Sequence, residues 1–108
     1  MKLPFLDSIV IEESKLTNYI LNANHPDGGV KAKFLIKRRF DKDSIKTALI
    51  NQAKNEEVKE VKKSEFGIKY IIESKINSPD GKTFFLRSVW IVYLNEKFVK
   101  FITAYQIK

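Results

Sequence analysis

In the first half of the chain, apolar residues recur at the three- and four-residue spacing of helices. The pattern predicts a short strand over residues 8–12, then a first helix with Ser14 as its N-cap. This helix should end near Asn22, because Pro26 and the two glycines that follow it cannot continue a helix. Two more helices are predicted: one over residues 29–38, and one that Asp43 or Ser44 would cap and that runs to about Lys54.

From Val58 onward the pattern changes to the alternation of β-strands. SPDG at residues 78–81 has proline and glycine where a β-turn prefers them, and NEK at residues 95–97 is a second turn. Four strands are predicted, over residues 58–63, 67–76, 84–93 and 98–105. Helices followed by a meander indicate the α+β class. We predict one domain over residues 1–108, with two or three N-terminal helices packed on one face of a four-stranded antiparallel sheet.

Side chains alternate across a strand, so the predicted strands define two faces of different character. The first face is almost entirely apolar and should lie under the helices; it comprises Ile68, Tyr70, Ile72, Phe84, Leu86, Trp90, Val92, Ile102 and Ala104. The second face is mixed, with an apolar middle and polar groups toward one end; it comprises Lys69, Ile71, Glu73, Lys75, Phe85, Arg87, Val89, Ile91, Phe101, Thr103 and Tyr105.

The two hairpin loops predict a row of polar residues on the mixed face. A three-residue PDG loop places Glu73 opposite Arg87, and a three-residue NEK loop places Arg87 opposite Tyr105. A slip of one residue in either hairpin would destroy the row. The row also has a simpler explanation, because cross-strand ion pairs stabilise sheets by about 0.2–1 kcal/mol without any further function.

Composition narrows the chemistry that the chain can perform. The absence of cysteine excludes disulfides, a thiolate nucleophile and a cysteine zinc site, and a single histidine cannot build a histidine-rich metal site, so no metal or cofactor is expected. The formal charge of +7 and the pI of about 9.6 favour a polyanionic partner. No apolar run approaches the roughly 20 residues of a membrane span, and residues 1–14 do not resemble a signal peptide. We expect a cytoplasmic protein with no membrane partner.

The densest basic segment follows the single histidine, His25. It contains Lys31, Lys33, Lys37, Arg38, Arg39, Lys42 and Lys46. These side chains could hold phosphate oxygens, or they could form the solvated face of a helix. His25 could act as a general acid or base near neutral pH, or it could cap a helix end or face water. Cleavage of RNA by its 2′-hydroxyl needs a base, an acid and a cation, which His25, the lysines and Arg87 could supply together.

Three segments of the chain, in this order, resemble a known family: KLTNYILNANHPDGGVKAKFL (15–35), FGIKYIIESKINSPDGKT (66–83) and RSVWIVYLNEKFVKFITAY (87–105). They are similar to the uncharacterised bacterial domain of unknown function 6883 and cover nearly the whole chain. That family's layout is similar to the metal-independent ribonucleases that include barnase, the colicin tRNases and RelE-like toxins. The resemblance implies a ribonuclease fold of two helices and a sheet, a site on the open sheet face, and a toxin–antitoxin or toxin–immunity setting.

The resemblance marks individual residues of this chain, namely His25, Lys31, Arg87, Trp90, Thr103 and Tyr105. Two positions depart from the family pattern. Gln106 stands where the pattern has a proline, and Lys82 stands where it has an arginine, which loses bidentate phosphate geometry. Because Trp90 falls on the apolar face, we interpret it as a core residue.

The resulting hypothesis is a toxin-like, metal-independent ribonuclease that uses general acid–base catalysis. His25 would be the acid or base, Lys31 and Arg87 would stabilise phosphate charge, and Thr103 and Tyr105 would position it. Glu73 would be the second acid–base group or the orienter of Arg87. Nucleic-acid binding is predicted for Lys33, Lys37, Arg38, Arg39, Lys69 and Lys82. The alternative is a non-catalytic basic module that docks nucleic acid or an acidic partner such as an antitoxin or immunity protein; His25 would then be dispensable.

Overall fold

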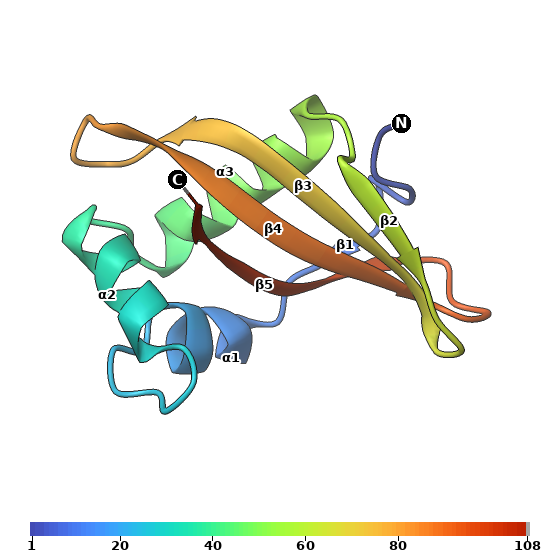
Figure 1. Ribbon diagram of the computed structural model, residues 1–108, viewed down its shortest axis with the longest axis horizontal. Helices are drawn as coiled ribbons and strands as arrows, with labels where there is room; N and C mark the ends of the chain where they lie inside the picture. Colours follow the sequence, from blue (N-terminus) through green and yellow to red (C-terminus); the bar gives the residue numbers. More distant parts are fainter. Residues whose placement is uncertain (108) are drawn as a thin grey trace.

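The fold, seen in a computed structural model that describes residues 1–107, is α+β, with the helices before most of the sheet (Figure 1). The elements are β1 (Ile9–Val10), α1 (Glu13–Lys15), the π-helix η1 (Leu16–Ile20), α2 (Gly29–Lys37), α3 (Lys42–Asn55), β2 (Glu60–Lys63), β3 (Gly67–Asn77), β4 (Thr83–Tyr93) and β5 (Val99–Ile107). The predicted helices and strands are therefore present, with boundaries that differ by a few residues.

The sheet has five strands rather than the four that were predicted, in the order β1-β5-β4-β3-β2. The four predicted strands form an antiparallel meander, but β1 adds to its edge by pairing in parallel with β5, so the sheet is mixed. Ile9 pairs with Val99, which lies far away in the sequence. Local alternation predicts that a strand exists but says nothing about such a distant partner, which explains the difference.

The helices cover one face of the sheet and extend around its β5 edge, rather than packing on one face alone. In Figure 1, α3 lies behind β3 and β4, whereas α1 and α2 lie beside β5. Leu16 of η1, Leu35 of α2 and Leu49 of α3 are all fully buried in one core with Trp90. The interpretation of Trp90 as a core residue is therefore confirmed.

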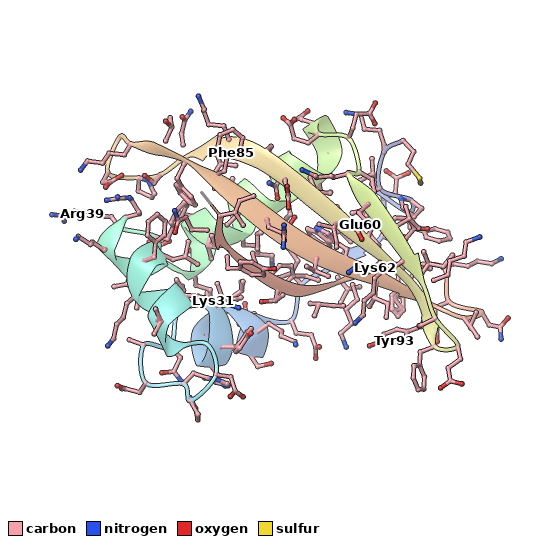
Figure 2. All side chains as sticks on the ribbon, in the orientation of Figure 1. Lys31, Arg39, Glu60, Lys62, Phe85 and Tyr93 are labelled. Atoms are coloured by element: carbon pink, nitrogen blue, oxygen red, sulfur yellow. The ribbon has the colours of Figure 1, made fainter. Side chains whose placement is uncertain are left out.

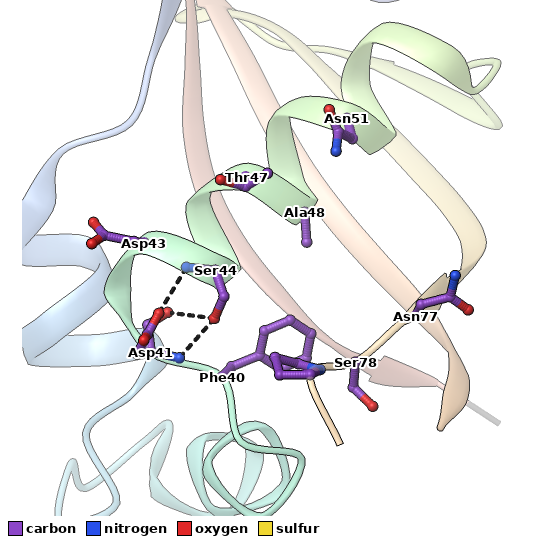
Figure 3. Close-up of a pocket in the computed structure, with 10 residues that line it drawn as sticks. Phe40, Asp41, Asp43, Ser44, Thr47, Ala48, Asn51, Asn77 and Ser78 are labelled. Atoms are coloured by element: carbon purple, nitrogen blue, oxygen red, sulfur yellow. Dashed lines mark hydrogen bonds between the residues drawn. The ribbon is translucent and has the colours of Figure 1, made fainter. Parts of the chain in front are cut away.

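The helix caps differ from the predicted ones. The first helix follows Glu12 rather than Ser14, with no capping side chain, and continues as a π-helical turn. Helix α3 is capped by Asp41 rather than by Asp43 or Ser44. Figure 3 shows the reciprocal pair: the Asp41 carboxylate accepts the Ser44 N–H at 2.8 Å, and the Ser44 hydroxyl oxygen accepts the Asp41 N–H at 2.9 Å. This capping box satisfies two backbone donors, which a cap at Asp43 would leave free.

The β3–β4 turn has the predicted geometry. The Ser78 N–H donates to the Lys82 carbonyl at 2.8 Å, and the Gly81 N–H donates to the Ser78 carbonyl at 3.0 Å. Gly81 has a φ of +84°, the left-handed conformation that glycine adopts without strain. The loop therefore sets the predicted pairing of Glu73 with Arg87.

The β4–β5 hairpin combines a loop of unexpected register with a bulge. Near the loop Ile91 pairs with Lys100, one residue out of the register that a three-residue NEK loop would give. A β-bulge between Val89 and Trp90 restores the predicted register beyond it. Because of this bulge Phe101 lies opposite Trp90 and is fully buried, so its predicted place on the mixed face is wrong.

Candidate functional site

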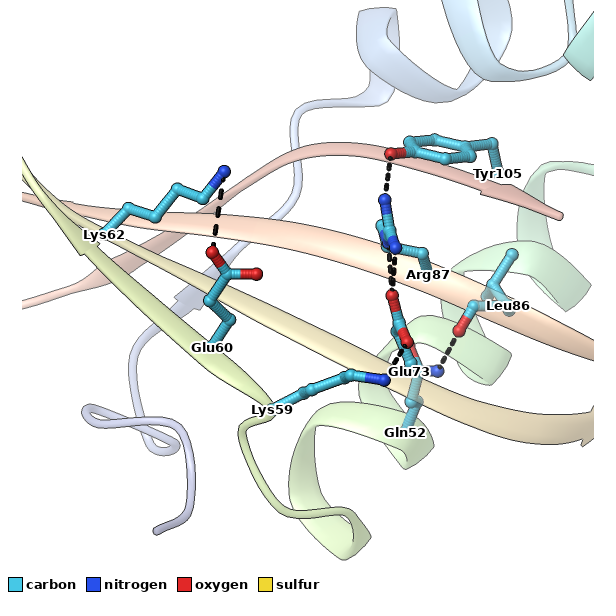
Figure 4. A network of polar contacts seen from close by, with 8 residues as sticks. All are labelled: Gln52, Lys59, Glu60, Lys62, Glu73, Leu86, Arg87 and Tyr105. Atoms are coloured by element: carbon cyan, nitrogen blue, oxygen red, sulfur yellow. Dashed lines mark hydrogen bonds and ion pairs between the residues drawn. The ribbon is translucent and has the colours of Figure 1, made fainter. Parts of the chain in front are cut away.

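The centre of the candidate site is a row of three side chains on the open face of the sheet (Figure 4). Glu73 of β3 pairs with Arg87 of β4, which in turn pairs with Tyr105 of β5. The Arg87 guanidinium donates from Nε to Glu73 Oε2 and forms an ion pair with the same oxygen through Nη2, and its Nη1 donates to the Tyr105 hydroxyl at 3.0 Å. The predicted row therefore exists, and the Arg87 guanidinium is fixed between Glu73 and Tyr105.

A lysine flanks each end of this row. Lys59, immediately before β2, places its Nζ 2.8 Å from Glu73 Oε1. Lys31 of α2 places its Nζ 4.2 Å from the centre of the Tyr105 ring, within the range of a cation–π contact. Two cations thus lie beside Tyr105, one at its hydroxyl and one over its face. This arrangement favours an anion at that end of the row.

Ion pairing alters the protonation behaviour of the row. The hydrogen bond from Lys59, together with Arg87, lowers the pKa of Glu73 from its ordinary value of 4.5, although partial burial opposes the shift. The hydrogen bonds with Tyr105 and then Glu73 raise the pKa of Arg87. Both shifts favour the charged forms, so at neutral pH the row contains an ionised carboxylate paired with a cation.

Glu73→Gln is expected to lower the free energy of unfolding by about 1–2 kcal/mol at pH 7, because it removes a carboxylate that two cations hold. The pKa of Glu73 is lower in the folded protein than its ordinary value of 4.5, so this stabilisation is present above that value and is lost as the pH falls through the folded pKa. Urea unfolding of both proteins at pH 7 and pH 3 measures the difference, which should shrink at pH 3.

The matched control for this measurement is Glu60→Gln. Glu60 lies at the same sheet face but is exposed, and its carboxylate pairs only loosely with Lys62, at 3.6 Å (Figure 4). This substitution should change stability by less than about 0.5 kcal/mol at either pH. Equal effects of the two substitutions would show that Glu73 has no special partner in solution.

His25 lies in the loop between η1 and α2, half-buried, with its ring edge against the Tyr19 ring at 4.9 Å between centroids. Its Nδ1 accepts the backbone N–H groups of Asp27 and Gly28, each at 3.1 Å. These bonds place the proton of the neutral ring on Nε2. Within residues 1–107, the hydrogen bonds and ring contacts of His25 link it to its own loop and Tyr19, and none links it to the Arg87 row.

His25→Ala is expected to lower the free energy of unfolding by about 1 kcal/mol, because two backbone donors lose their acceptor. Urea unfolding of the wild type and the variant at pH 7 measures the difference. Equal stability of the two proteins would contradict these two contacts.

Thr103 lies close to Lys31 but outside the hydrogen-bonded row. It pairs with Val89 across β4 and β5 and lines a narrow hollow with Tyr19, Gly28 and Lys31. Its hydroxyl oxygen is buried and has no hydrogen-bond partner among the residues that the structure describes. The hollow has no room for a water molecule, so the Thr103 hydroxyl is closed to solvent in this arrangement of α2 and β5.

The six residues predicted to bind nucleic acid are spread over three regions. Lys33, Lys37 and Arg39 are exposed on or just after α2, and Figure 2 shows Arg39 at the end of the molecule. Arg38 is partly buried, stacks over Phe34 at 5.0 Å and pairs with Asp80 at 3.5 Å, so it ties α2 to the β3–β4 turn. Lys82 is exposed on that turn, and Lys69 is exposed farther along the open face.

Sequence reasoning did not identify Lys59, although it completes the surroundings of Glu73. The signal that could have found it is the register of the β2–β3 hairpin, in which Lys63 pairs with Ile68 and the Lys59 N–H bonds to the Ile71 carbonyl. The loop of that hairpin, SEFG, has a glycine at its end but lacks the proline that helped to fix the β3–β4 register.

The largest hollow, about 560 Å³, lies away from the row, between α3 and the β3–β4 turn (Figure 3). Asp41, Asp43, Ser44 and Asn77 contribute to its lining. Asp41 and Ser44 are already used in capping α3. An acidic lining does not suit a phosphate, so this hollow contributes nothing to the candidate site.

No helix within residues 1–107 is long and apolar enough to cross a membrane. Over the same residues, no group of three or more histidine, aspartate or glutamate side chains could hold a metal ion.

The chain belongs to the family described as the domain of unknown function DUF6883, whose model matches residues 2–108. The resemblance found in the three sequence segments is therefore confirmed. No curated protein matches the chain.

Among solved structures, the fold is similar to a chain of a contact-dependent growth inhibition toxin–immunity protein complex from Klebsiella pneumoniae 342. The TM-score is 0.73 over 96% of this chain and 97% of that chain, with 18% sequence identity. The agreement over both whole chains establishes a shared fold.

Proposed function

We propose that this domain is a toxin-like ribonuclease that cleaves RNA without a metal ion, at the row formed by Glu73, Arg87 and Tyr105. The observation that carries the proposal is the guanidinium of Arg87, fixed between a carboxylate and a hydroxyl on an open sheet face. Preorganised donors of this kind stabilise developing negative charge because they need not reorient during the reaction.

The side chains of the row and Lys31 can supply the proton acceptor, the proton donor and the positive charge that RNA cleavage needs. The Glu73 carboxylate accepts the proton of the 2′-hydroxyl, whose oxygen attacks the adjacent phosphorus. Arg87 and Lys31 stabilise the extra negative charge of the phosphorane. The bond from phosphorus to the 5′-oxygen breaks, and that oxygen takes a proton from the Tyr105 hydroxyl. The products are a 2′,3′-cyclic phosphate and a free 5′-hydroxyl, and solvent returns the two side chains to their starting states.

The contacts of each side chain support its role. Glu73 is ionised at neutral pH, and Lys59 and Arg87 hold its carboxylate in place while they lower its pKa. Tyr105 uses its oxygen to accept from Arg87, so its own proton is available to a phosphate oxygen. The positioning role of Thr103 stays a prediction, because its hydroxyl is buried beside Lys31. This scheme does not use the acid–base role predicted for His25, and a loss of about 10²- to 10⁴-fold in cleavage by His25→Ala with the fold intact would establish that role instead.

The direct test is cleavage of a labelled single-stranded RNA by the purified protein in EDTA. A matched oligonucleotide that carries one 2′-deoxy residue serves as the control, because cleavage at the substituted position should stop if the 2′-hydroxyl is the nucleophile. Cyclic phosphate ends on the products would support the proposal. No cleavage of either oligonucleotide, or cleavage that does not depend on the 2′-hydroxyl, would contradict it.

The second candidate is a non-catalytic module that binds an acidic protein partner. It is favoured by the formal charge of +7 and by the solved structure with the same fold, which is a complex between a toxin and an immunity protein. Under this alternative the exposed cations of α2 would carry the binding, and Glu73→Gln would leave partner affinity unchanged. Salt-sensitive binding of an acidic protein without any RNA cleavage would favour it.

A further inference from the structure

A second cationic row crosses the open face of the sheet, parallel to the Arg87 row. Lys62 of β2 pairs with Lys69 of β3, Lys69 with Ile91 of β4, and Ile91 with Lys100 of β5. Lys69 and Ile91 lie four residues along β3 and β4 from Glu73 and Arg87, which corresponds to about 13 Å of strand. An even number of residues separates the rows, so both project from the same face.

The charges in this second row are incompletely balanced. Two lysines stand directly opposite each other at Lys62 and Lys69, a pairing that destabilises a sheet. Lys62 pairs with Glu60 at 3.6 Å and Lys100 with Glu12 at 2.8 Å. Lys69 is exposed, and within residues 1–107 it makes no ion pair. An anion at Lys69 would relieve this repulsion.

Aromatic side chains lie beside these lysines. A groove of about 360 Å³ is lined by Lys69, Lys100, Phe66 and Tyr93, among others. The Phe66 and Tyr93 side chains are 68% and 40% exposed. Gly67 has a φ of +157° and pairs closely with Tyr93. A Cβ atom at Gly67 would lie 2.3 Å from the Val92 carbonyl oxygen. This close approach brings the turn that contains Phe66 against the end of β4. Figure 2 shows Lys62 and Tyr93 at the end of the sheet remote from Arg39.

We propose that this row and its aromatic groove form a second subsite for single-stranded RNA, which binds nucleotides that flank the cleaved bond. The inference rests on the proposed function and extends it. Single-stranded nucleic acid is bound by grooves that combine lysines for the phosphates with exposed aromatic rings for the bases. An acidic protein would match the lysines alone and would leave Phe66 and Tyr93 without stacking partners. Both rows cross β3, β4 and β5 and project from the same face, which we call the RNA track.

The test compares Lys69→Glu with Lys54→Glu, which makes the same charge change at an exposed position of α3, behind the sheet. Binding of a labelled single-stranded DNA oligonucleotide, which lacks the 2′-hydroxyl and so cannot be cut by this chemistry, is measured by fluorescence anisotropy. Lys69→Glu should weaken binding by about tenfold and reduce the salt dependence by roughly one phosphate contact. Lys54→Glu should change affinity by less than about twofold, since α3 does not face the RNA track.

Thermal unfolding separates binding from folding. Lys69→Glu would place a carboxylate opposite Lys62, so its Tm should equal or exceed that of the wild type while its affinity falls. Phe66→Ala and Tyr93→Ala should each weaken binding by about tenfold through lost stacking. Because both rings are exposed, their replacement should leave the fold intact.

The outcomes distinguish the subsite from the ribonuclease proposal. Equal weakening by Lys69→Glu and Lys54→Glu would overturn the subsite and indicate general charge attraction. Binding of poly-glutamate in preference to the oligonucleotide would also overturn it, in favour of an acidic partner. If the oligonucleotide binds through Lys69 and the wild type nevertheless fails to cleave RNA, the subsite stands and the proposed catalytic function fails.

Discussion

Arg87→Lys is expected to reduce kcat/KM for RNA cleavage by about 10²- to 10³-fold, the range that loss of one preorganised electrostatic donor produces. The substitution keeps a positive charge, but it loses the planar fork that reaches Glu73 and Tyr105 at the same time. Initial rates in EDTA, measured with the wild type and the variant at equal concentrations, give the effect directly.

The control for this prediction is Arg39→Lys. Arg39 is exposed just after α2. Its φ is +69°, and because lysine also has a Cβ atom, the substitution does not change the cost of this backbone conformation. It should retain cleavage within about threefold, the scale of a single exposed charge contact. Full activity of Arg87→Lys, with native circular dichroism, would remove Arg87 from the reaction and favour the binding-module alternative.

Trp90→Ala is expected to lower the free energy of unfolding by about 3–5 kcal/mol, a large share of the total stability of a small domain. Trp90 is fully buried and meets Phe101 edge to face at 5.4 Å between centroids. Its indole N–H donates to the Ser88 hydroxyl at 2.9 Å, and that hydroxyl donates to Gln52 at 2.6 Å. The substitution therefore leaves a cavity and disturbs a buried polar chain.

Urea unfolding followed by far-ultraviolet circular dichroism is the suitable measurement, because Trp90 is the one tryptophan in the sequence and its fluorescence is lost in the variant. Phe85→Ala provides the control on the same strand, since Phe85 is 43% exposed and faces the other way. Its cost should stay near 1 kcal/mol. A loss below 1 kcal/mol for Trp90→Ala would contradict the position of this residue in the core.

The strands and the Glu73–Arg87–Tyr105 row could be predicted because short-range chemistry encodes them. Alternation assigns each side chain to a face, and the proline and glycine of SPDG set the register between Glu73 and Arg87. The Arg87–Tyr105 pairing was predicted correctly from an incorrect loop length, because the bulge supplies the missing residue.

Contacts between distant segments could not be predicted in the same way. The parallel pairing of Ile9 with Val99, and the approach of Lys31 to Tyr105, depend on how the helices pack around the sheet edge. The choice of Asp41 as the α3 cap among three neighbouring polar residues depends on a reciprocal bond with Ser44, which composition does not reveal. The bulge could not be predicted from a glycine either, because the paired segments around it contain none.

The bulge between Val89 and Trp90 divides the β4–β5 hairpin into two ladders of different register. The ladder at the loop contains Ile91 and Lys100, and the ladder beyond the bulge contains Arg87 and Tyr105. The bulge already accommodates a one-residue difference in register between these ladders. A change in the length of the 94–98 loop therefore need not alter the pairing of Arg87 with Tyr105. An insertion at the hairpin tip is thus expected to leave the geometry of the row unchanged.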